Sequence, residues 1–217
     1  MSQYSPQGFS MLPSGVKHLL IINVLVFLAT LVLERFGYLN ITNMLCLWPV
    51  NSGFFHIWQP LTYMFMHASI DHIFFNLFAL WMFGYVLENF WGTKRFVAYY
   101  LICGIGAAVV HMTISILFHL PPVPTVGASG AVYGILLAFG MMFPNERIYL
   151  YFLVPIKAKW FVIGYAAIEL FEGLFRSSDG VAHFAHLGGM LFGFILIMLW
   201  RNHSSRSNRW NDDNYRI

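Results

Sequence analysis

The chain has 217 residues, of which 59% are hydrophobic and only 10% are charged. Soluble domains average about 25% charged residues. This composition, with a mean hydropathy of +0.65, therefore excludes an ordinary soluble domain and predicts a multi-pass membrane protein. The net charge of +3 is too small to suggest nucleic acid as a partner. Cys46 and Cys103 are too isolated to form the spacing of a metal or redox motif.

Apolar segments predict six membrane-spanning helices, because a helix satisfies its own backbone groups in lipid. In chain order they cover residues 16–36, 60–89, 96–119, 129–143, 158–175 and 181–200. We therefore expect an all-α membrane protein with a six-transmembrane-helix bundle at residues 16–200. A polar N-terminus at 1–15 and a polar tail at 201–217 would both be cytoplasmic. The connection at 38–59 is long and aromatic, which predicts that it lies partly in the outer membrane interface.

The distribution of Lys and Arg predicts the orientation of these spans. With the N-terminus in the cytoplasm, ten of the 12 Lys and Arg residues fall on the inner side, and only Arg35 and Arg176 fall outside. Such a bias follows the positive-inside rule. Residues 1–15 lack the basic start and apolar core of a secretory signal, and no transit peptide is evident. We therefore expect a bacterial cytoplasmic membrane protein.

Four polar side chains stand out within three of the predicted spans. They are His72 and Asn76 in "HIFFN", Ser129 in "GASG" and His186 in "AHLGG". At 1.5 Å per residue, Ser129, His186 and Asn76 lie roughly 20–27 Å above the inner ends of their helices. Polar residues are costly in a membrane, so each is a functional candidate. We expect all four to share a cavity open to the outer side.

These residue types predict acyl-transfer chemistry at that cavity. Ser129 would be the nucleophile and His186 its general base. His72, Asn76 and the Ser129 backbone N–H would form the oxyanion hole, because first-turn helix amides lack intrahelical acceptors. Tyr133, one turn beyond Ser129, would pack against the His186 ring. No Asp or Glu is expected at this depth near His186, so the prediction is a Ser–His dyad rather than a triad.

Glycines in the same motifs have a packing interpretation. Gly127 would allow the turn before Ser129, while Gly189 and Gly193 would let the fourth and sixth spans approach closely. Taken alone, "GASG" and "AHLGG" are more often packing motifs than catalytic ones. His183, one turn from His186, is the alternative base.

Three glutamates have no catalytic role in this prediction. Glu88 is expected to pair with Arg95 or to cap backbone groups, which is a structural role. Glu169 and Glu172, in the fifth span, are left without a role.

Three motifs in order, "HASIDHIFFN", "GASGAVYG" and "AHLGGMLFG", resemble the rhomboid family of intramembrane serine proteases. The similarity extends over about residues 16–200, and the set is far more specific than any single motif. The resemblance implies the roles given above for Ser129, His186, His72, Asn76 and Tyr133. It further implies single-span membrane proteins as substrates, cut near the outer end of the span, with a lid at 176–180. Gln59 stands where many members of the family have Arg.

Three other functions are compatible with parts of this sequence. A catalytically silent scaffold of the same family typically lacks the nucleophile or the base, and both are present here. A transporter would place its polar site at mid-depth, with related halves. A metalloprotease would use the histidines of "HASIDH" and "HFAH" as ligands but would leave Ser129 and Asn76 unexplained. The expected cofactors are none, and no metal is expected.

Overall fold

The computed structural model describes residues 9–37, 39–150, 153–175 and 182–214, and most of these residues are helical. The α-helices are α1 (Ser14–Arg35), α2 (Leu39–Leu45), α3 (Gln59–Thr62), α4 (Ile70–Trp91), α5 (Thr93–Leu117), α6 (Ser129–Met142), α7 (Ala158–Phe175) and α8 (His183–Asn214). Two single-turn 3-10 helices lie at Val50–Ser52 and Tyr63–Phe65. A small hairpin, β1 (Arg147–Leu150) and β2 (Val154–Lys157), joins α6 to α7.

Four helices of the described chain are long and apolar enough to cross a membrane, namely α1, α4, α5 and the first part of α8 (His183–Asn202). The helix α6 is apolar but has only 14 residues, which gives a length of about 21 Å. The helix α7 has 18 residues and carries Lys159, Glu169 and Glu172. The structure therefore supports a multi-pass helical membrane bundle, and the count of six spans stays a prediction.

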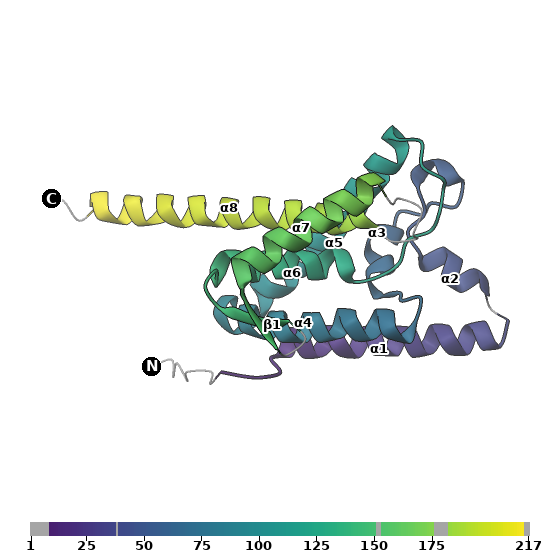
Figure 1. Ribbon diagram of the computed structural model, residues 1–217, viewed down its shortest axis with the longest axis horizontal. Coiled ribbons are helices and arrows are strands. Elements are labelled where there is room, and N and C mark those ends of the chain that lie inside the picture. The colour runs from purple at the N-terminus through teal and green to yellow at the C-terminus, as the bar shows by residue number, and fades with distance from the viewer. Residues whose placement is uncertain (1–8, 38, 151–152, 176–181, 215–217) are drawn as a thin grey trace.

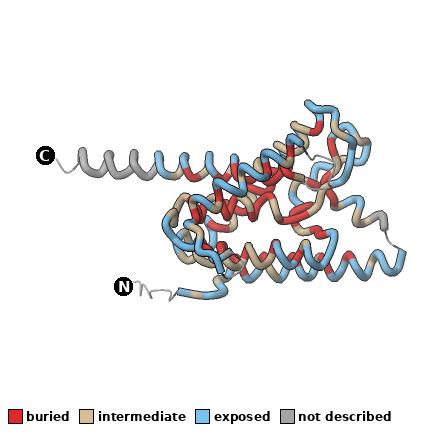
Figure 2. The backbone as a smooth tube through the Cα atoms, viewed as in Figure 1, coloured by how far each residue is buried: buried red, intermediate tan, exposed pale blue. Residues whose placement is uncertain are grey.

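The short helix α6 lies at the centre of the bundle. Figure 1 shows α6 between α4 on one side and α5 and α8 on the other, and α8 packs most extensively against α5 and α6. Figure 2 shows that buried residues concentrate on these central helices, while α1 and α7 are largely exposed. The start of α1 and the end of α8 lie at one end of the bundle, and α2 lies at the other (Figure 1).

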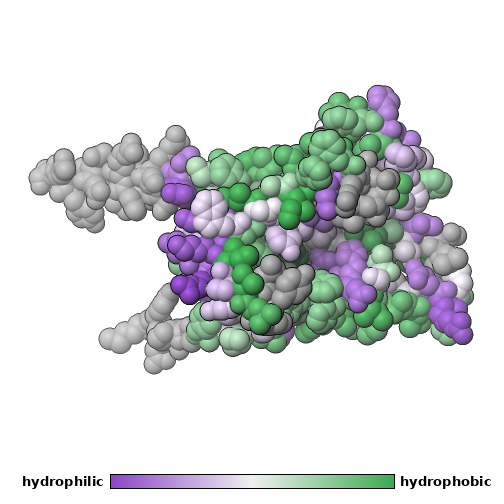
Figure 3. All heavy atoms as spheres, in the orientation of Figure 1, coloured by the Kyte–Doolittle hydropathy of each residue, from purple (hydrophilic) through white to green (hydrophobic). Residues whose placement is uncertain are grey.

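The visible surface has the polarity of a membrane protein. In Figure 3, hydrophobic residues cover most of the middle of the molecule, and hydrophilic residues gather mainly toward its two ends. Large apolar side chains such as Leu25, Phe75 and Phe171 are 58–66% exposed. In water such a surface would promote aggregation, whereas in lipid it is the solvated surface.

The second predicted span begins later than expected. Residues 60–65 form α3 and a 3-10 turn, and the backbone then becomes extended at Met66 (ψ 141°). The helix α4 starts at Ile70 because the Ser69 hydroxyl caps it by accepting a hydrogen bond from the His72 N–H. Hydropathy predicts one span here because both helices are apolar. The capping residue Ser69 is the sequence signal that separates them.

Two glycines of α8 allow close helix contacts on different neighbours. A methyl group at Gly189 would lie 1.8 Å from the carbonyl oxygen of Gly130 in α6. A methyl group at Gly193 would instead lie 2.3 Å from the Tyr99 hydroxyl in α5. Gly189 therefore brings α8 against α6 as expected, whereas Gly193 packs against α5 rather than α6.

Gln59 fixes the first loop to the bundle. Its side chain is completely buried. The carbonyl accepts from the Trp48 N–H (3.1 Å), and the amide donates to the carbonyls of Phe54 (3.0 Å) and Met44 (3.3 Å). A neutral amide, with donors and an acceptor, thus ties three points of this loop together. The loop also pairs with the segment before α6, through reciprocal 2.9 Å hydrogen bonds between Leu47 and Thr125.

The last helix does not end at the predicted boundary of residue 200. It continues through the polar segment to Asn214, although its apolar part ends at Asn202. Arg95 lies with its guanidinium carbon 4.2 Å from the ring centre of Trp200, so it makes a cation–π contact rather than an ion pair with Glu88. The predicted start of this span at residue 181 and the predicted lid at 176–180 lie outside the described residues.

Candidate active site

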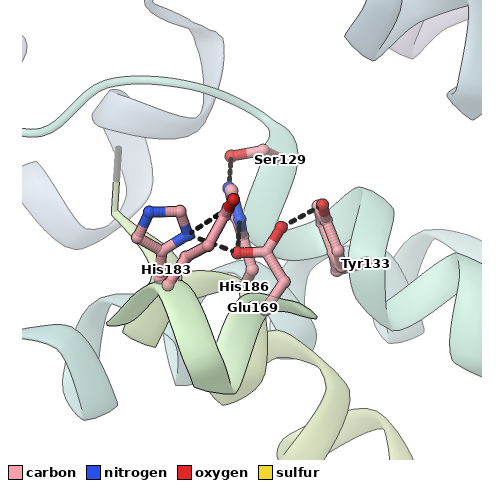
Figure 4. Close-up of polar contacts among 6 residues, drawn as sticks. Ser129, Tyr133, Glu169, His183 and His186 are labelled. Atoms are coloured by element: carbon pink, nitrogen blue, oxygen red, sulfur yellow. Dashed lines mark hydrogen bonds and ion pairs between the residues drawn. The ribbon is translucent and has the colours of Figure 1, made fainter. Parts of the chain in front are cut away.

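Ser129 and His186 are in direct contact. The Ser129 Oγ lies 2.9 Å from the His186 Nε2 (Figure 4). Ser129 is the first residue of α6, and His186 lies in the first turn of α8. The Gly130–Gly189 contact between these helices lies one residue beyond Ser129 and three beyond His186. Residues 57 positions apart therefore meet because two helices start side by side.

The turn before Ser129 requires glycine. Gly127 has φ +128°, a conformation that L-residues with a side chain rarely adopt. A methyl group there would also lie 2.8 Å from the His72 Nε2. The backbone angle and the lack of space beside His72 therefore both require glycine at position 127. This glycine lets the His72 ring lie close to Ser129. The Ser129 N–H, at the start of α6, has no acceptor within the helix.

The His186 ring is held on its face and at its second nitrogen. Tyr133 stacks on it with ring centres 4.2 Å apart and an interplanar angle of 6°. The His186 Nδ1 lies 2.8 Å from the Glu169 Oε2. The expectation that no carboxylate lies near His186 is therefore wrong. The helix α7 places Glu169, to which the sequence pattern assigns no role, at the depth of the site.

Glu169 is buried, with only 5% of its surface exposed, and it has three side-chain partners (Figure 4). Its Oε2 also lies 2.8 Å from the His183 Nδ1. Its Oε1 accepts a short hydrogen bond from the Tyr133 hydroxyl. The carboxylate thus joins side chains of α6, α7 and α8, and each of its oxygens is used.

His72 and Asn76 approach the same space from α4. The Ala68 N–H donates to the His72 Nδ1 over a long 3.4 Å. An accepting Nδ1 places the proton of a neutral ring on Nε2, the nitrogen beside Gly127. The Asn76 amide donates one hydrogen to the His72 carbonyl (2.8 Å) and has a second N–H available by its chemistry. Both residues therefore offer N–H donors near Ser129.

A single cavity connects these groups. Its volume is about 850 Å³, and its walls include His72, Asn76, Ser129 and His186. His111 and Thr125 also line it, and they bond to each other at 3.0 Å. The structure thus brings together every predicted member of the nucleophile, base and oxyanion set. Their catalytic roles stay predictions.

Glu169, His183 and His186 also have the donor types of a metal site. Their candidate ligand atoms lie within 4.8 Å of one another. Carboxylate and imidazole are common zinc ligands. Each of these atoms is, however, already engaged in the hydrogen-bond network described above. Hydrogen bonds thus account for the approach of both imidazoles to the carboxylate, and the expectation of no metal stays a prediction.

These features define a polytopic helical membrane protein with the geometry of a serine hydrolase site in its interior. A rhomboid domain family model matches residues 55–203, more than half of the chain. This chain belongs to the rhomboid family.

Several curated relatives support this assignment. The chain is 36% identical to the mitochondrial RHOMBOID-like protein 6 of Arabidopsis thaliana, over 73% of this chain and 49% of that protein. It is 32% identical to rhomboid protease GluP of Bacillus subtilis, over 63% of this chain and 25% of that protein. It is 31% identical to the mitochondrial Rhomboid protein 1 of Saccharomyces cerevisiae, over 60% of this chain and 38% of that protein. The matched region thus spans less than half of each of these relatives.

Proposed function

We propose that this chain is an intramembrane serine endopeptidase. It hydrolyses peptide bonds in or near the transmembrane segments of single-span proteins in the same lipid bilayer. The observation that carries the proposal is the 2.9 Å contact between the Ser129 Oγ and the His186 Nε2 at the wall of one cavity. Family membership and the name of the Bacillus relative support it.

The chemistry begins with proton transfer within the Ser129–His186 pair. The His186 Nδ1 faces a carboxylate and therefore carries a proton, so Nε2 presents its lone pair to the Ser129 hydroxyl. As Oγ attacks the substrate carbonyl carbon, its proton moves to Nε2. The imidazolium then gives that proton to the leaving amine, and an acyl-enzyme on Ser129 remains. Water, activated in turn by His186, hydrolyses it and restores the serine.

The negative oxygen of the tetrahedral intermediate needs donors that are already in place. The Ser129 N–H lies at the N-terminus of α6, where the helix dipole favours negative charge. The His72 Nε2–H and the second N–H of Asn76 converge on the same cavity. Three preformed donors fit an oxyanion hole made of His72, Asn76 and the Ser129 backbone.

Substrate selection follows from the state of a peptide bond in a membrane. A helical substrate has its carbonyls hydrogen-bonded and shielded, so a bond must leave the helix to reach Ser129. The polar cavity can satisfy the freed backbone groups, which lipid cannot do. This favours substrates whose helix is easily unwound near its outer end.

We place the protein in a bacterial cytoplasmic membrane, with both termini in the cytoplasm. The orientation is supported by the Lys and Arg bias and by the position of the start of α1 and the end of α8 at the same end of the bundle (Figure 1). Reporter fusions to each terminus, expressed in a bacterial host, test this topology. A reporter active only outside the cytoplasm would contradict it.

The decisive test uses purified protein in liposomes with a fluorescent single-span substrate. Wild type should cleave it, and Ser129→Ala should lose cleavage while its thermal unfolding is unchanged. Cleavage retained by Ser129→Ala would defeat the nucleophile assignment.

Two controls separate the alternative readings. A fluorophosphonate should label wild type and fail to label Ser129→Ala. A protein that neither cleaves nor labels would be a non-catalytic scaffold. Inhibition by a metal chelator would favour a metalloprotease, for which the structure offers Glu169, His183 and His186 as candidate ligands in place of the full set of histidines considered above.

A further inference from the structure

A buried glutamate on α7 has no part in a two-residue mechanism, yet it is bonded to the candidate base. Glu169 lies 2.8 Å from the His186 Nδ1 through Oε2. A buried carboxylate is costly unless hydrogen-bond donors surround it. His183 and Tyr133 supply two further donors, one to each oxygen. Three side chains of the site therefore bond to one carboxylate, which lies on the side of the His186 ring that faces away from Ser129.

The hydrogen-bond chemistry of this contact fixes the state of the base. A carboxylate only accepts, so the nitrogen facing it must carry hydrogen. His186 is therefore held with its proton on Nδ1 and its lone pair on Nε2, 2.9 Å from the Ser129 Oγ. The other tautomer would point an N–H at the serine and could not take its proton.

We propose that Glu169 is a positioning residue, which makes the site a Ser129–His186–Glu169 triad rather than a dyad. This inference rests on the function proposed above. When Oγ attacks, the serine proton moves to Nε2 and the Nδ1 proton stays on the ring. Glu169 remains unprotonated and stabilises the imidazolium, as the acid does in other serine-hydrolase triads.

His183 and Tyr133 hold the carboxylate in place in this arrangement. His183 donates to the same oxygen as His186, and Tyr133 donates to the other oxygen while its ring stacks on His186. Their contacts restrict both the rotation of the carboxylate and the plane of the imidazole. Figure 4 shows Glu169 between His183, His186 and Tyr133, with Ser129 at the opposite end of the His186 ring.

A purely structural role makes a different prediction. Glu169 is one of only four buried residues of α7, so it also helps to hold that helix to α6 and α8. If Glu169 only held α7 in place, its replacement would lower the stability of the fold, and activity would fall only as far as folded protein is lost. A positioning residue affects kcat and the tautomer of His186 while the fold and KM are retained.

The experiment compares Glu169→Gln with wild type on the fluorescent substrate in liposomes. Glutamine keeps the size of the side chain but removes the charge, and its amide can donate to Nδ1 and favour the wrong tautomer. We expect kcat to fall about 10²- to 10⁴-fold, as for carboxylate-to-amide changes in triads, with KM within about threefold. Glu169→Asp, which keeps the charge on a shorter stem, should lie between the two.

Glu172→Gln is the matched control. It is the same substitution on the same helix, at a side chain that is 33% exposed and lies 3.8 Å from His183. Its kcat should stay within about threefold of wild type. If Glu169→Gln folds and keeps its kcat while Ser129→Ala is inactive, the positioning role is wrong and the protease function stands.

A spectroscopic readout keeps the inference testable without any cleavage. In ¹⁵N-histidine-labelled wild type, NMR should find the neutral His186 ring protonated on Nδ1. A wild-type ring protonated on Nε2 would overturn the proposal, even if Glu169→Gln failed to fold or the protein cut no substrate. The protease function, by contrast, is judged by Ser129→Ala and labelling alone.

Discussion

Two buried glutamates lie in different regions of this bundle, and their carboxylates are hydrogen-bonded by different kinds of partner. Glu88, only 2% exposed, accepts from the N–H groups of Gly15 and Val16 at 2.7 Å each and from the Thr93 hydroxyl at 2.6 Å. Glu169, 5% exposed, is bonded by three side chains, His183, His186 and Tyr133. Both carboxylates are fully engaged, so burial alone does not distinguish their roles.

The partners distinguish them. Glu88 takes the place of an N-cap for α1, because Pro13 at that position has no side-chain hydrogen bond. Backbone amides cannot titrate, so Glu88 only holds α1 against α4. The partners of Glu169 include an imidazole that can gain and lose a proton beside a serine. A buried acid bonded to titratable side chains is thus a better functional signal than a buried acid on backbone.

The largest expected change in kcat distinguishes His186 from His183, the two histidines that bond to Glu169. His186→Ala should reduce kcat at least about 10³-fold, because the base is lost. His183→Ala should reduce it only about tenfold, since one of three partners of the carboxylate is lost and the base remains. Cleavage rates in liposomes check this. The reverse order would show that the wrong histidine is assigned as base.

A smaller effect is expected on the other side of the cavity. Asn76→Ala removes one of three oxyanion donors and should lower kcat by about 10²-fold or less. KM should change little, because the interaction forms only in the transition state. An unchanged kcat in the same assay would remove Asn76 from the oxyanion hole and would leave His72 and the Ser129 N–H.

The matching substitution at the other carboxylate should change stability instead of rate. Glu88→Gln weakens two charge-assisted bonds at the start of α1 and should cost about 1.5–3 kcal/mol. Its kcat, measured on the folded fraction, should stay near wild type. Unfolding in a denaturing detergent measures the loss of stability. A large loss of kcat without a loss of stability would show that Glu88 acts on the reaction and that its structural role is wrongly assigned.

The smallest effect is expected at the third partner of Glu88. Thr93→Val keeps the shape of the side chain but removes the hydroxyl that donates to the carboxylate. Thr93 is exposed, so the loss should not exceed about 1 kcal/mol. The same unfolding assay checks this, and a larger loss would mean that the hydroxyl, rather than the backbone amides, dominates this contact.

Much of the candidate site could be predicted from the sequence. Ser129, His186 and Asn76 were placed at one depth by counting residues from the inner ends of their helices, and the structure brings them to one cavity. The same count would have found Glu169. It lies 11 residues beyond Ala158, which is about 17 Å along α7. The residue types alone do not single it out, because Glu169 and Glu172 stand close together on the same helix and hydropathy does not show which of them is buried.

Other features needed three-dimensional information. The sequence allowed Glu88 either Arg95 or backbone groups, and only the position of α1 beside α4 decides for the backbone. Gly193 faces Tyr99 rather than α6 because α5 and α6 both pack against the glycines of α8. The hairpin between α6 and α7 and the separate helix α3 follow from local turns within apolar sequence, where hydropathy gives no boundary.

The small contact area of α7 has a mechanical consequence. Most of its large side chains, such as Ile163, Ile168 and Phe171, face outward, whereas the helices carrying Ser129 and His186 are packed in the core. A tilt of α7 would therefore disturb little apolar packing, and its main cost would be the lost contacts of Glu169, while serine and histidine stayed adjacent. If Glu169 positions His186 as proposed, a tilt of α7 forced by lipid thickness or by a neighbouring helix would lower kcat while the Ser129–His186 contact persisted.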